Sequence, residues 1–206
     1  SGIDMTHLGT FDISMISNIP NIVYLAPTNK EEYLSMLDWS IEQVEHPVFI
    51  RVPLGEPVTT GKVDKTNYSD LNKYQVVRKG SDVAIIALGT FFKLGKKVYD
   101  RLKQAGFNPT LINPKFITGI DEDLLDRLKD EHNITITLED GILDGGFGQK
   151  IASYYGDSEM KVLNYGGKKE FTDRVKVTEL YERYRLTPEL IFEDVMKLQS
   201  GNLLYA

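Results

Sequence analysis

The residues best suited to chemistry lie at the start of the chain, in the segment THLGTFD from Thr6 to Asp12. His7 carries an imidazole, the side chain most easily poised to donate a hydrogen bond or move a proton near neutral pH. Gly9 gives the loop backbone freedom, and Asp12 adds a carboxylate. A loop histidine can equally have a structural role, so the pattern by itself leaves both readings open.

A second candidate is the glycine-rich stretch DGGFGQ, from Asp144 to Gln149. Glycines there would let a backbone approach a phosphate, but the spacing and the place in the chain do not match a dinucleotide fingerprint. We therefore predict a structural turn that lets a helix N-terminus pack closely. Glu139 and Asp140, just before it, are expected to be a cap or an interface charge. The GDS run at 156–158 resembles the start of a magnesium-diphosphate motif but lacks its continuation, so we predict no metal site.

Composition narrows the class of protein. The 206 residues carry a net charge of −6, so there is no basic field for nucleic acid or an anionic membrane surface, and we expect neither partner. The absence of cysteine excludes disulfides, thiolate zinc sites and a cysteine nucleophile, and it fits a cytoplasmic protein. No apolar run approaches the roughly 18 to 20 residues of a membrane span. His46 and His132 are predicted to lie on the surface.

The chain opens in what reads as a loop already under way, and we expect it to be part of a longer protein. Its first elements are a strand at 22–25, a helix and a second strand at 48–52 that Pro53 stops. Thr28 and Glu31 have the spacing of a capping box for that helix. Its predicted sheet-facing stripe consists of Leu34, Leu37, Ile41 and Val44.

From Glu56 to Lys73 the apolar pattern fades into turn formers and charges, which indicates a linker. Beyond it, strands alternate with helices, the pattern of a three-layer α/β domain with a mostly parallel sheet. The predicted strands are 82–88, 110–112, 134–138 and 161–165. The predicted helices carry Leu94, Val98 and Leu102 up to Gly106; Leu124, Leu125 and Leu128 after a cap at Asp121; residues 150–155; and Thr187-Pro188 to about Leu198.

Several segments together resemble one family. They are THLGTFDISMISNIPNIVYLAPTNKEEYLSML, HPVFIRVPLG, DVAIIALGT and TITLEDGILDGGFGQ. These sequences resemble the 1-deoxy-D-xylulose-5-phosphate synthases, which are transketolase-like enzymes that use thiamine diphosphate. The similarity covers nearly the whole chain. It is specific, because transketolases and the β subunits of 2-oxoacid dehydrogenases share the fold but do not usually carry H-x-G-x-F-D followed by I-P-N.

The resemblance implies a domain organisation. Residues 1–58 would be the second half of a pyrimidine-binding domain, 59–73 a linker, and 74–206 a transketolase C-terminal domain. It also implies a homodimer. In such enzymes thiamine diphosphate lies between domains, and an N-terminal domain holds its diphosphate through magnesium. The glutamate that activates the cofactor lies in the first half of the pyrimidine-binding domain. Neither part is in this sequence, so we expect the isolated chain to bind no cofactor tightly and to be inactive.

The resemblance also implies site residues. His7 aligns with the active-site histidine, and Asp4 and Arg51 with substrate-binding positions, although a structural bracing role is favoured for Arg51. Asp4 stands three residues before the histidine, where the family has its aspartate four before. The family's second arginine, which grips the acceptor phosphate, is replaced by Leu54, and leucine cannot make that contact.

The implied activity of the full-length enzyme is the condensation of pyruvate with D-glyceraldehyde 3-phosphate. The products are carbon dioxide and 1-deoxy-D-xylulose 5-phosphate, a precursor for isoprenoids and thiamine. Two alternatives stay open. Leu54 favours a transketolase-like paralogue with another acceptor, and the missing cofactor domain favours a noncatalytic interaction module.

Overall fold

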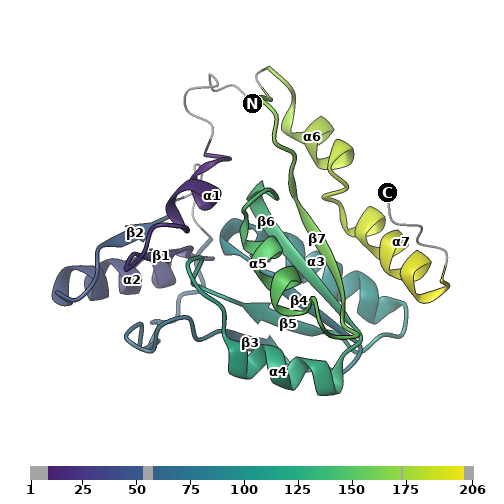
Figure 1. Cartoon of the computed structure of the whole chain (residues 1–206), viewed down its shortest axis with the longest axis horizontal. Coiled ribbons are helices and arrows are strands. Elements are labelled where there is room, and N and C mark those ends of the chain that lie inside the picture. Colours follow the sequence, from purple (N-terminus) through teal and green to yellow (C-terminus); the bar gives the residue numbers. More distant parts are fainter. Residues whose placement is uncertain (1–8, 53–57, 173, 202–206) are drawn as a thin grey trace.

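The computed structural model describes residues 9–52, 58–172 and 174–201, and it contains two separate sheets. Strands β1 (Val23–Leu25) and β2 (Val48–Ile50) form a small parallel sheet. The large sheet has the order β3-β5-β4-β6-β7. Figure 1 shows the small sheet and its helices beside the large one.

The large sheet is mostly parallel, as predicted. Its strands are β3 (Gln75–Arg78), β4 (Val83–Ala87), β5 (Thr110–Asn113), β6 (Ile134–Ile142) and β7 (Lys161–Gly167). Only β3, at one edge, runs antiparallel to its neighbour, β5. The alternation of strand and helix therefore gave the right sheet type, although β3 itself was not predicted.

Helices cover both faces of this sheet and give three layers (Figure 1). Val83, Ile85 and Ala87 of β4 face the core shared with α3 (Phe92–Gln104) and α7 (Pro188–Gln199). Ala84 and Ile86 face the opposite core, shared with α4 (Glu122–Glu131) and α5 (Phe147–Tyr154). Because both faces are covered, β4 reads as a continuous apolar run and all five of its residues are buried.

Three helix ends agree with the sequence signals. The Asp121 side chain accepts a hydrogen bond from the Leu124 N–H at the start of α4. Thr187 does the same for Leu190, with Pro188 in the first turn of α7. Gly106 follows α3 with a φ of 91°, a conformation that glycine adopts without strain.

The N-terminal part consists of α1 (Asp12–Ile16), β1, α2 (Lys30–Glu42) and β2, and it shares a core with the large sheet. Ile13, Tyr24 and Ala26 pack in the same cluster as the residues under α4 and α5. One edge of β1 is held by the segment around Phe116, through a bridge from Leu25 to Phe116.

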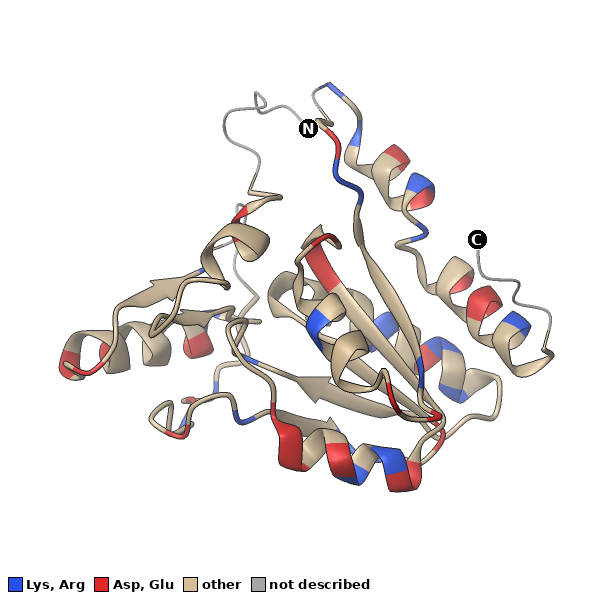
Figure 2. Cartoon of the chain, in the orientation of Figure 1, with Lys and Arg blue, Asp and Glu red and all other residues tan. Residues whose placement is uncertain are grey.

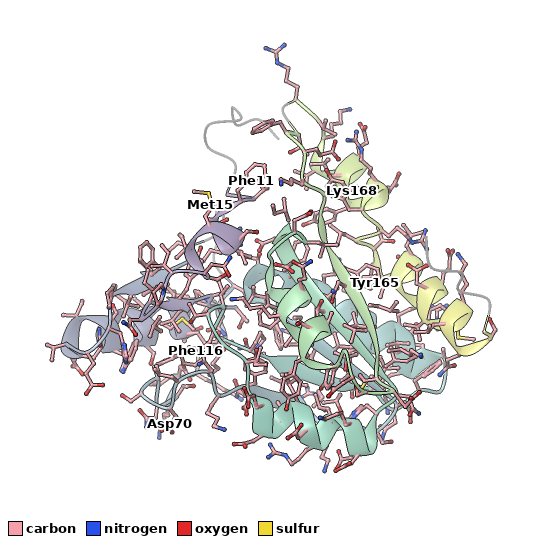
Figure 3. All side chains as sticks on the ribbon, in the orientation of Figure 1. Phe11, Met15, Asp70, Phe116, Tyr165 and Lys168 are labelled. Atoms are coloured by element: carbon pink, nitrogen blue, oxygen red, sulfur yellow. The ribbon has the colours of Figure 1, made fainter. Side chains whose placement is uncertain are left out.

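Residues 59–73 contain no helix or strand, yet they are not a free tether. Tyr68 is buried and its ring lies between Trp39 and Phe116, at centroid distances of 6.1 and 6.2 Å. Figure 3 shows Phe116 where the N-terminal part meets the large sheet. The proposed boundaries at 58 and 74 remain a prediction.

Several local predictions were wrong or incomplete. The N-cap of α2 is Asn29, one residue after Thr28, and its side chain accepts from the Glu32 N–H. His132 is buried in the short turn between α4 and β6, and its Nε2 lies 2.7 Å from Thr110 Oγ1. The short helices α1 and α6 (Val177–Arg183) were not predicted, and α5 begins at Phe147, inside the glycine-rich stretch.

The predicted apolar stripe of α2 does not face the sheet. Leu34, Ile41 and Val44 are 45%, 73% and 96% exposed, whereas Met36 and Glu32 are buried. The physical reason is the width of the small sheet, because two strands cover only one narrow face of the helix. Leu37 is half-buried and Trp39 packs beside the small sheet, whereas Leu34 and Ile41 are left facing outward.

Among the described residues, no helix is long and apolar enough to cross a membrane. Figure 2 shows acidic and basic residues interspersed along α4. The charged residues of this helix are exposed, whereas its leucines are buried against the sheet. Such mixed charge is typical of a solvated helix face.

Candidate functional site

The structure tests the predicted site residues unequally. Asp4, His7 and Leu54 lie outside the described residues. Gly9, Phe11 and Asp12 of the same motif are described, and so is Arg51. The described part of the candidate site consists of these residues and those that they contact.

Arg51 is the centre of a cluster that joins the two sheets. It follows β2, and its side chain is 16% exposed. Its Nε donates to Asp12 Oδ2 at 2.7 Å, its Nη1 donates to Asp140, and its Nη2 donates to the Gly9 carbonyl. Burial alone lowers the pKa of Arg51, but the carboxylates of Asp140 and Asp12 outweigh it and the pKa is raised. The guanidinium therefore stays charged and engages all three nitrogens within the chain.

Two hydroxyl groups complete this Arg51 cluster, which we define as Arg51, Asp12, Asp140, Tyr24 and Thr90. The Tyr24 hydroxyl donates to Asp12 Oδ2 at 2.5 Å, and Thr90 Oγ1 donates to Asp140 Oδ2 at 2.8 Å. Burial and the hydrogen bond to Asp12 raise the pKa of Tyr24, so this phenol stays protonated. Each carboxylate thus has two different donors.

The cluster lies where open α/β sheets place ligands. After β4 the chain passes to α3 on one face, and after β6 it passes to α5 on the other. Loops that diverge from adjacent parallel strands leave a crevice outside the carboxyl ends of those strands. Thr90 follows β4, and Asp140 lies near the end of β6. The N-terminal part inserts Asp12 and Arg51 at this point.

The described part of THLGTFD is fixed against the same carboxyl ends of the strands. The Ile142 N–H donates to the Thr10 carbonyl at 2.9 Å, and Ser14 Oγ donates to the Asp144 carbonyl at 2.7 Å. The rings of Phe11 and Phe171 meet edge to face at 5.6 Å. Figure 3 shows Phe11 beside the segment after β7, where Lys168 is labelled. The described end of the motif is therefore held at the carboxyl ends of the strands from several sides.

Glu139, next to Asp140, points away from Arg51 and caps the start of α5. Its carboxylate accepts from the N–H groups of Phe147 at 2.9 Å and Gly148 at 2.8 Å. Burial raises its pKa to about 7, although these two N–H groups and Arg51 act in the opposite direction. The pairing of β6 with β7 shifts register after Leu138, which helps to aim these adjacent carboxylates at two different partners.

The DGGFGQ stretch is a packed turn, as predicted. A Cβ at Gly146 would lie 2.5 Å from the Ile142 carbonyl oxygen, and one at Gly148 would lie 2.3 Å from Thr137 Oγ1. Glycine is needed because the turn presses against the sheet. The acidic pair before it was expected to be a cap or an interface charge, and the structure shows both: Glu139 caps α5 and Asp140 pairs with Arg51.

This geometry decides whether the described residues could hold a diphosphate cofactor. The N–H groups at the start of α5 are already bound to the chain's own Glu139 carboxylate. A diphosphate there would meet a buried acidic group in place of free donors. Among the described residues, no group of three or more His, Cys, Asp or Glu is arranged to hold a metal ion. The described residues therefore do not fit a magnesium-diphosphate group.

Sequence reasoning missed one further anchor, Lys150. Its Nζ donates to the carbonyls of Ser17, Ile117 and Thr118 at 3.2 to 3.3 Å, which ties α5 to the N-terminal part. Burial lowers its pKa. No spacing rule connects these positions, so only the fold reveals the contact.

Comparison with known proteins gives one family and several relatives. The family model described as "Transketolase, C-terminal domain" matches residues 72–191. The 1-deoxy-D-xylulose-5-phosphate synthase of Clostridium tetani is 38% identical over 195 residues, which are 94% of this chain and 31% of that protein. The synthase of Shouchella clausii is 33% identical with the same coverage. The chain thus spans about a third of the length of these curated relatives.

Two solved structures resemble the fold. A split gene transketolase, titled an inactive β4 tetramer, has a TM-score of 0.77 at 21% identity and matches 94% of this chain and 62% of its own. A transketolase mutant from Pichia stipitis has a TM-score of 0.68 at 13% identity, with 94% and 27% covered. At these identities the likeness concerns the fold alone.

Proposed function

Because the chain belongs to the transketolase C-terminal domain family, we propose that it is the C-terminal part of a thiamine-diphosphate-dependent transferase. The complete protein condenses pyruvate with D-glyceraldehyde 3-phosphate to 1-deoxy-D-xylulose 5-phosphate and carbon dioxide. The names of the relatives from Clostridium tetani and Shouchella clausii support this reaction. In such enzymes the cofactor supplies the carbanion chemistry, and the protein orients the substrates and handles protons.

The observation that carries the proposal is the Arg51 cluster. It holds the Gly9–Asp12 end of the THLGTFD motif at the switch point of the sheet. A fixed Gly9 two residues after His7 supports the proposal, because a proton-transfer group needs a fixed position. We assign His7 the role of donating a hydrogen bond or a proton to a substrate oxygen, with Asp4 as a neighbouring substrate contact.

Arg51 has a different part in this proposal. Its Nε, Nη1 and Nη2 all have acceptors within the chain, which favours a positioning role over a direct grip on substrate. The contact of Arg51 with substrate inferred from the family resemblance stays a prediction. A positioning role predicts that Arg51→Lys lowers turnover more than it raises the KM for the acceptor.

The cofactor needs residues beyond those described, and the small sheet offers a place for them. Among the described residues, β2 pairs with β1 alone, so its other edge has no strand partner. Phe49 on that strand is 41% exposed. We propose that the part of the protein corresponding to the rest of its relatives' length continues this parallel sheet and brings the cofactor with it.

The test combines the 206-residue chain with that cofactor-binding part, whether fused or separate. The chain alone should give no product and no stoichiometric magnesium-dependent binding of thiamine diphosphate in calorimetry. The combined protein should form the product, and His7→Ala should lower turnover by roughly two orders of magnitude while the cofactor still binds. Stoichiometric cofactor binding to the chain alone would contradict the proposal. A combined protein that folds and binds cofactor but turns over nothing would favour the interaction module.

Leu54 motivates a second test, on the acceptor. Without an arginine at this position, the acceptor phosphate is held by other groups or weakly. Under the paralogue alternative, Leu54→Arg should improve apparent affinity for D-glyceraldehyde 3-phosphate about tenfold, the worth of a charged hydrogen bond. Strong preference of the wild type for the phosphorylated aldehyde, with no gain from Leu54→Arg, would reject the altered acceptor.

We also propose a homodimer, which sedimentation of the complete protein will check.

A further inference from the structure

A second recess lies away from the Arg51 cluster, at the edge strand of the large sheet. One wall is formed by the start of α2 and by residues 58–62, and the other by β3 and α3. It encloses about 710 Å³, which is within the size range of small-molecule sites. None of the Arg51 cluster residues is among those that line it.

Four cationic side chains line this recess, which we term the β3–α3 groove: Lys62, Arg78, Lys93 and Lys96. None of them forms an ion pair within the part of the chain that the structure describes. They belong to three separate segments of sequence, in a chain whose net charge is −6. Cations gathered in a concave site of an acidic protein focus a positive potential there.

Two carboxylates also line the groove, and one of them is already satisfied. Glu32 is buried and accepts from the Thr28 N–H at 2.9 Å, from Thr28 Oγ1 at 3.0 Å and from Asn113 Nδ2 at 2.8 Å. The buried Lys115 ammonium lies 4.0 Å from it. Its charge is therefore neutralised inside the protein, which leaves Asp100 as the one exposed carboxylate among the lining residues.

The floor of the groove is apolar. It includes Phe92, Tyr99 and Leu111. The Lys96 ammonium lies over the Phe92 ring, 5.4 Å from the ring centroid. Apolar floors with a few charged groups at the rim are typical of sites for small organic ligands. The groove therefore suits a ligand that has both an apolar part and a negatively charged part.

The outer wall is held in place before any ligand arrives. Glu31 accepts from Thr59 Oγ1 at 2.5 Å and from the N–H groups of Thr60 and Gly61 at 3.0 Å. These hydrogen bonds lower the pKa of Glu31 to about 2, so the carboxylate stays ionised across the neutral range. A wall fixed in this way reduces the ordering cost of binding.

From this combination we propose that the β3–α3 groove binds a small organic phosphate. The phosphate lies among Lys62, Arg78, Lys93 and Lys96, and the apolar part of the ligand covers Tyr99 and Phe92. This inference is independent of the proposed function, because it uses none of the residues assigned to the reaction.

The test is isothermal calorimetry of the 206-residue chain with ADP, pyrophosphate and adenosine as probes. ADP should bind one to one and more tightly than pyrophosphate, because only ADP has both parts, and adenosine should bind most weakly. The affinity for ADP should fall as salt rises, because exposed charges are screened. A dissociation constant for ADP above about 1 mM at low salt would overturn the proposal.

Lys96→Gln and Lys97→Gln form a matched pair on α3. Both residues are exposed and carry the same charge, but only Lys96 lines the groove. Lys96→Gln should weaken ADP binding about tenfold, and Lys97→Gln should change it less than twofold. Equal weakening by the two variants would mean nonspecific attraction and would refute the groove as the site. Thermal melts check that both variants fold like the wild type.

Discussion

Arg51 and Asp140 stand 89 positions apart in the sequence, yet their charged groups form an ion pair that joins the small sheet to the large one. Arg51 follows β2 and Asp140 lies on β6. Their side chains are 16% and 24% exposed, so water screens the pair only in part. The same guanidinium holds Asp12 and the Gly9 carbonyl, and the pair therefore also fixes the described end of the THLGTFD loop.

Replacing Arg51 tests how far the two parts depend on this contact. Arg51→Met should lower the free energy of unfolding by about 3 kcal/mol, because it leaves Asp12 and Asp140 partly buried beside each other without a cation. Urea unfolding followed by circular dichroism measures the change. Arg183→Met is the matched control, since Arg183 forms its ion pairs with Glu170 and Glu179 at the surface, and it should hardly shift the transition. Equal effects of the two variants would refute a joining role for Arg51.

Glu139 gives a prediction for pH dependence. Its pKa is raised from 4.5 to about 7 in the folded protein, so between these values the unfolded chain releases a proton that the folded chain keeps. The contribution of Glu139 to stability is therefore complete below about pH 4.5 and is lost as the pH rises to about 7, by up to about 3 kcal/mol. Glu139→Gln removes this titration. The difference in unfolding free energy between wild type and variant should therefore fall as the pH rises from about 4.5 to about 7.

A control separates this effect from the general titration of the chain. Glu159 is exposed, so Glu159→Gln should reproduce the wild-type pH profile. If the Glu139→Gln profile also runs parallel to that of the wild type, the raised pKa is wrong. Chemical denaturation at a series of pH values gives all three curves.

Gly148 is predicted to resist even the smallest side chain. A Cβ there would lie 2.3 Å from Thr137 Oγ1 and 2.9 Å from Asn164 Oδ1, and these two atoms are themselves hydrogen-bonded at 2.7 Å. Gly148→Ala gains about 1 kcal/mol of helix propensity but forces this contact apart, so we expect a net loss of about 1 to 2 kcal/mol. At Gly156 the nearest atom to a Cβ is the Ser153 carbonyl oxygen at 3.2 Å, so Gly156→Ala should cost less. The midpoints of thermal unfolding compare the two variants, and the opposite ranking would contradict the packed turn.

Phe116 should be essential for docking β1. It is 1% exposed, it packs against Tyr68, and its backbone bridges to Leu25. Phe116→Ala should destabilise the chain by about 3 to 5 kcal/mol through lost burial and a cavity. Hydrogen exchange at the β1 amides should accelerate more than exchange at the β4 amides. Phe171→Ala, at a position 71% exposed, is the control and should leave exchange in β1 unchanged. Uniform acceleration in both strands after Phe116→Ala would show general rather than local loosening.

Parts of this molecule follow from local sequence. The strand at 83–87 is a continuous apolar run because both of its faces are covered, and such a run is visible without coordinates. Asp121 and Thr187-Pro188 mark helix starts because capping involves only residues three positions apart. The glycines at 146 and 148 predicted a close-packed turn because glycine has no side chain. The acidic pair before them was predicted to be a cap or an interface charge.

Other features depend on which segments the fold brings together. Sequence could mark Arg51 and Asp140 as charged residues of interest, but not that they meet, because an ion pair between two sheets leaves no spacing in the chain. The burial of His132 against Thr110 and the exposure of the α2 stripe were missed because burial depends on neighbours from other elements. The sequence by itself thus determined the strand and helix order and the family resemblance, since these depend on residue type and local spacing. Only the tertiary structure decided the partners of the charged side chains and the gathering of four cations in the β3–α3 groove, because these contacts join residues that are distant in the chain.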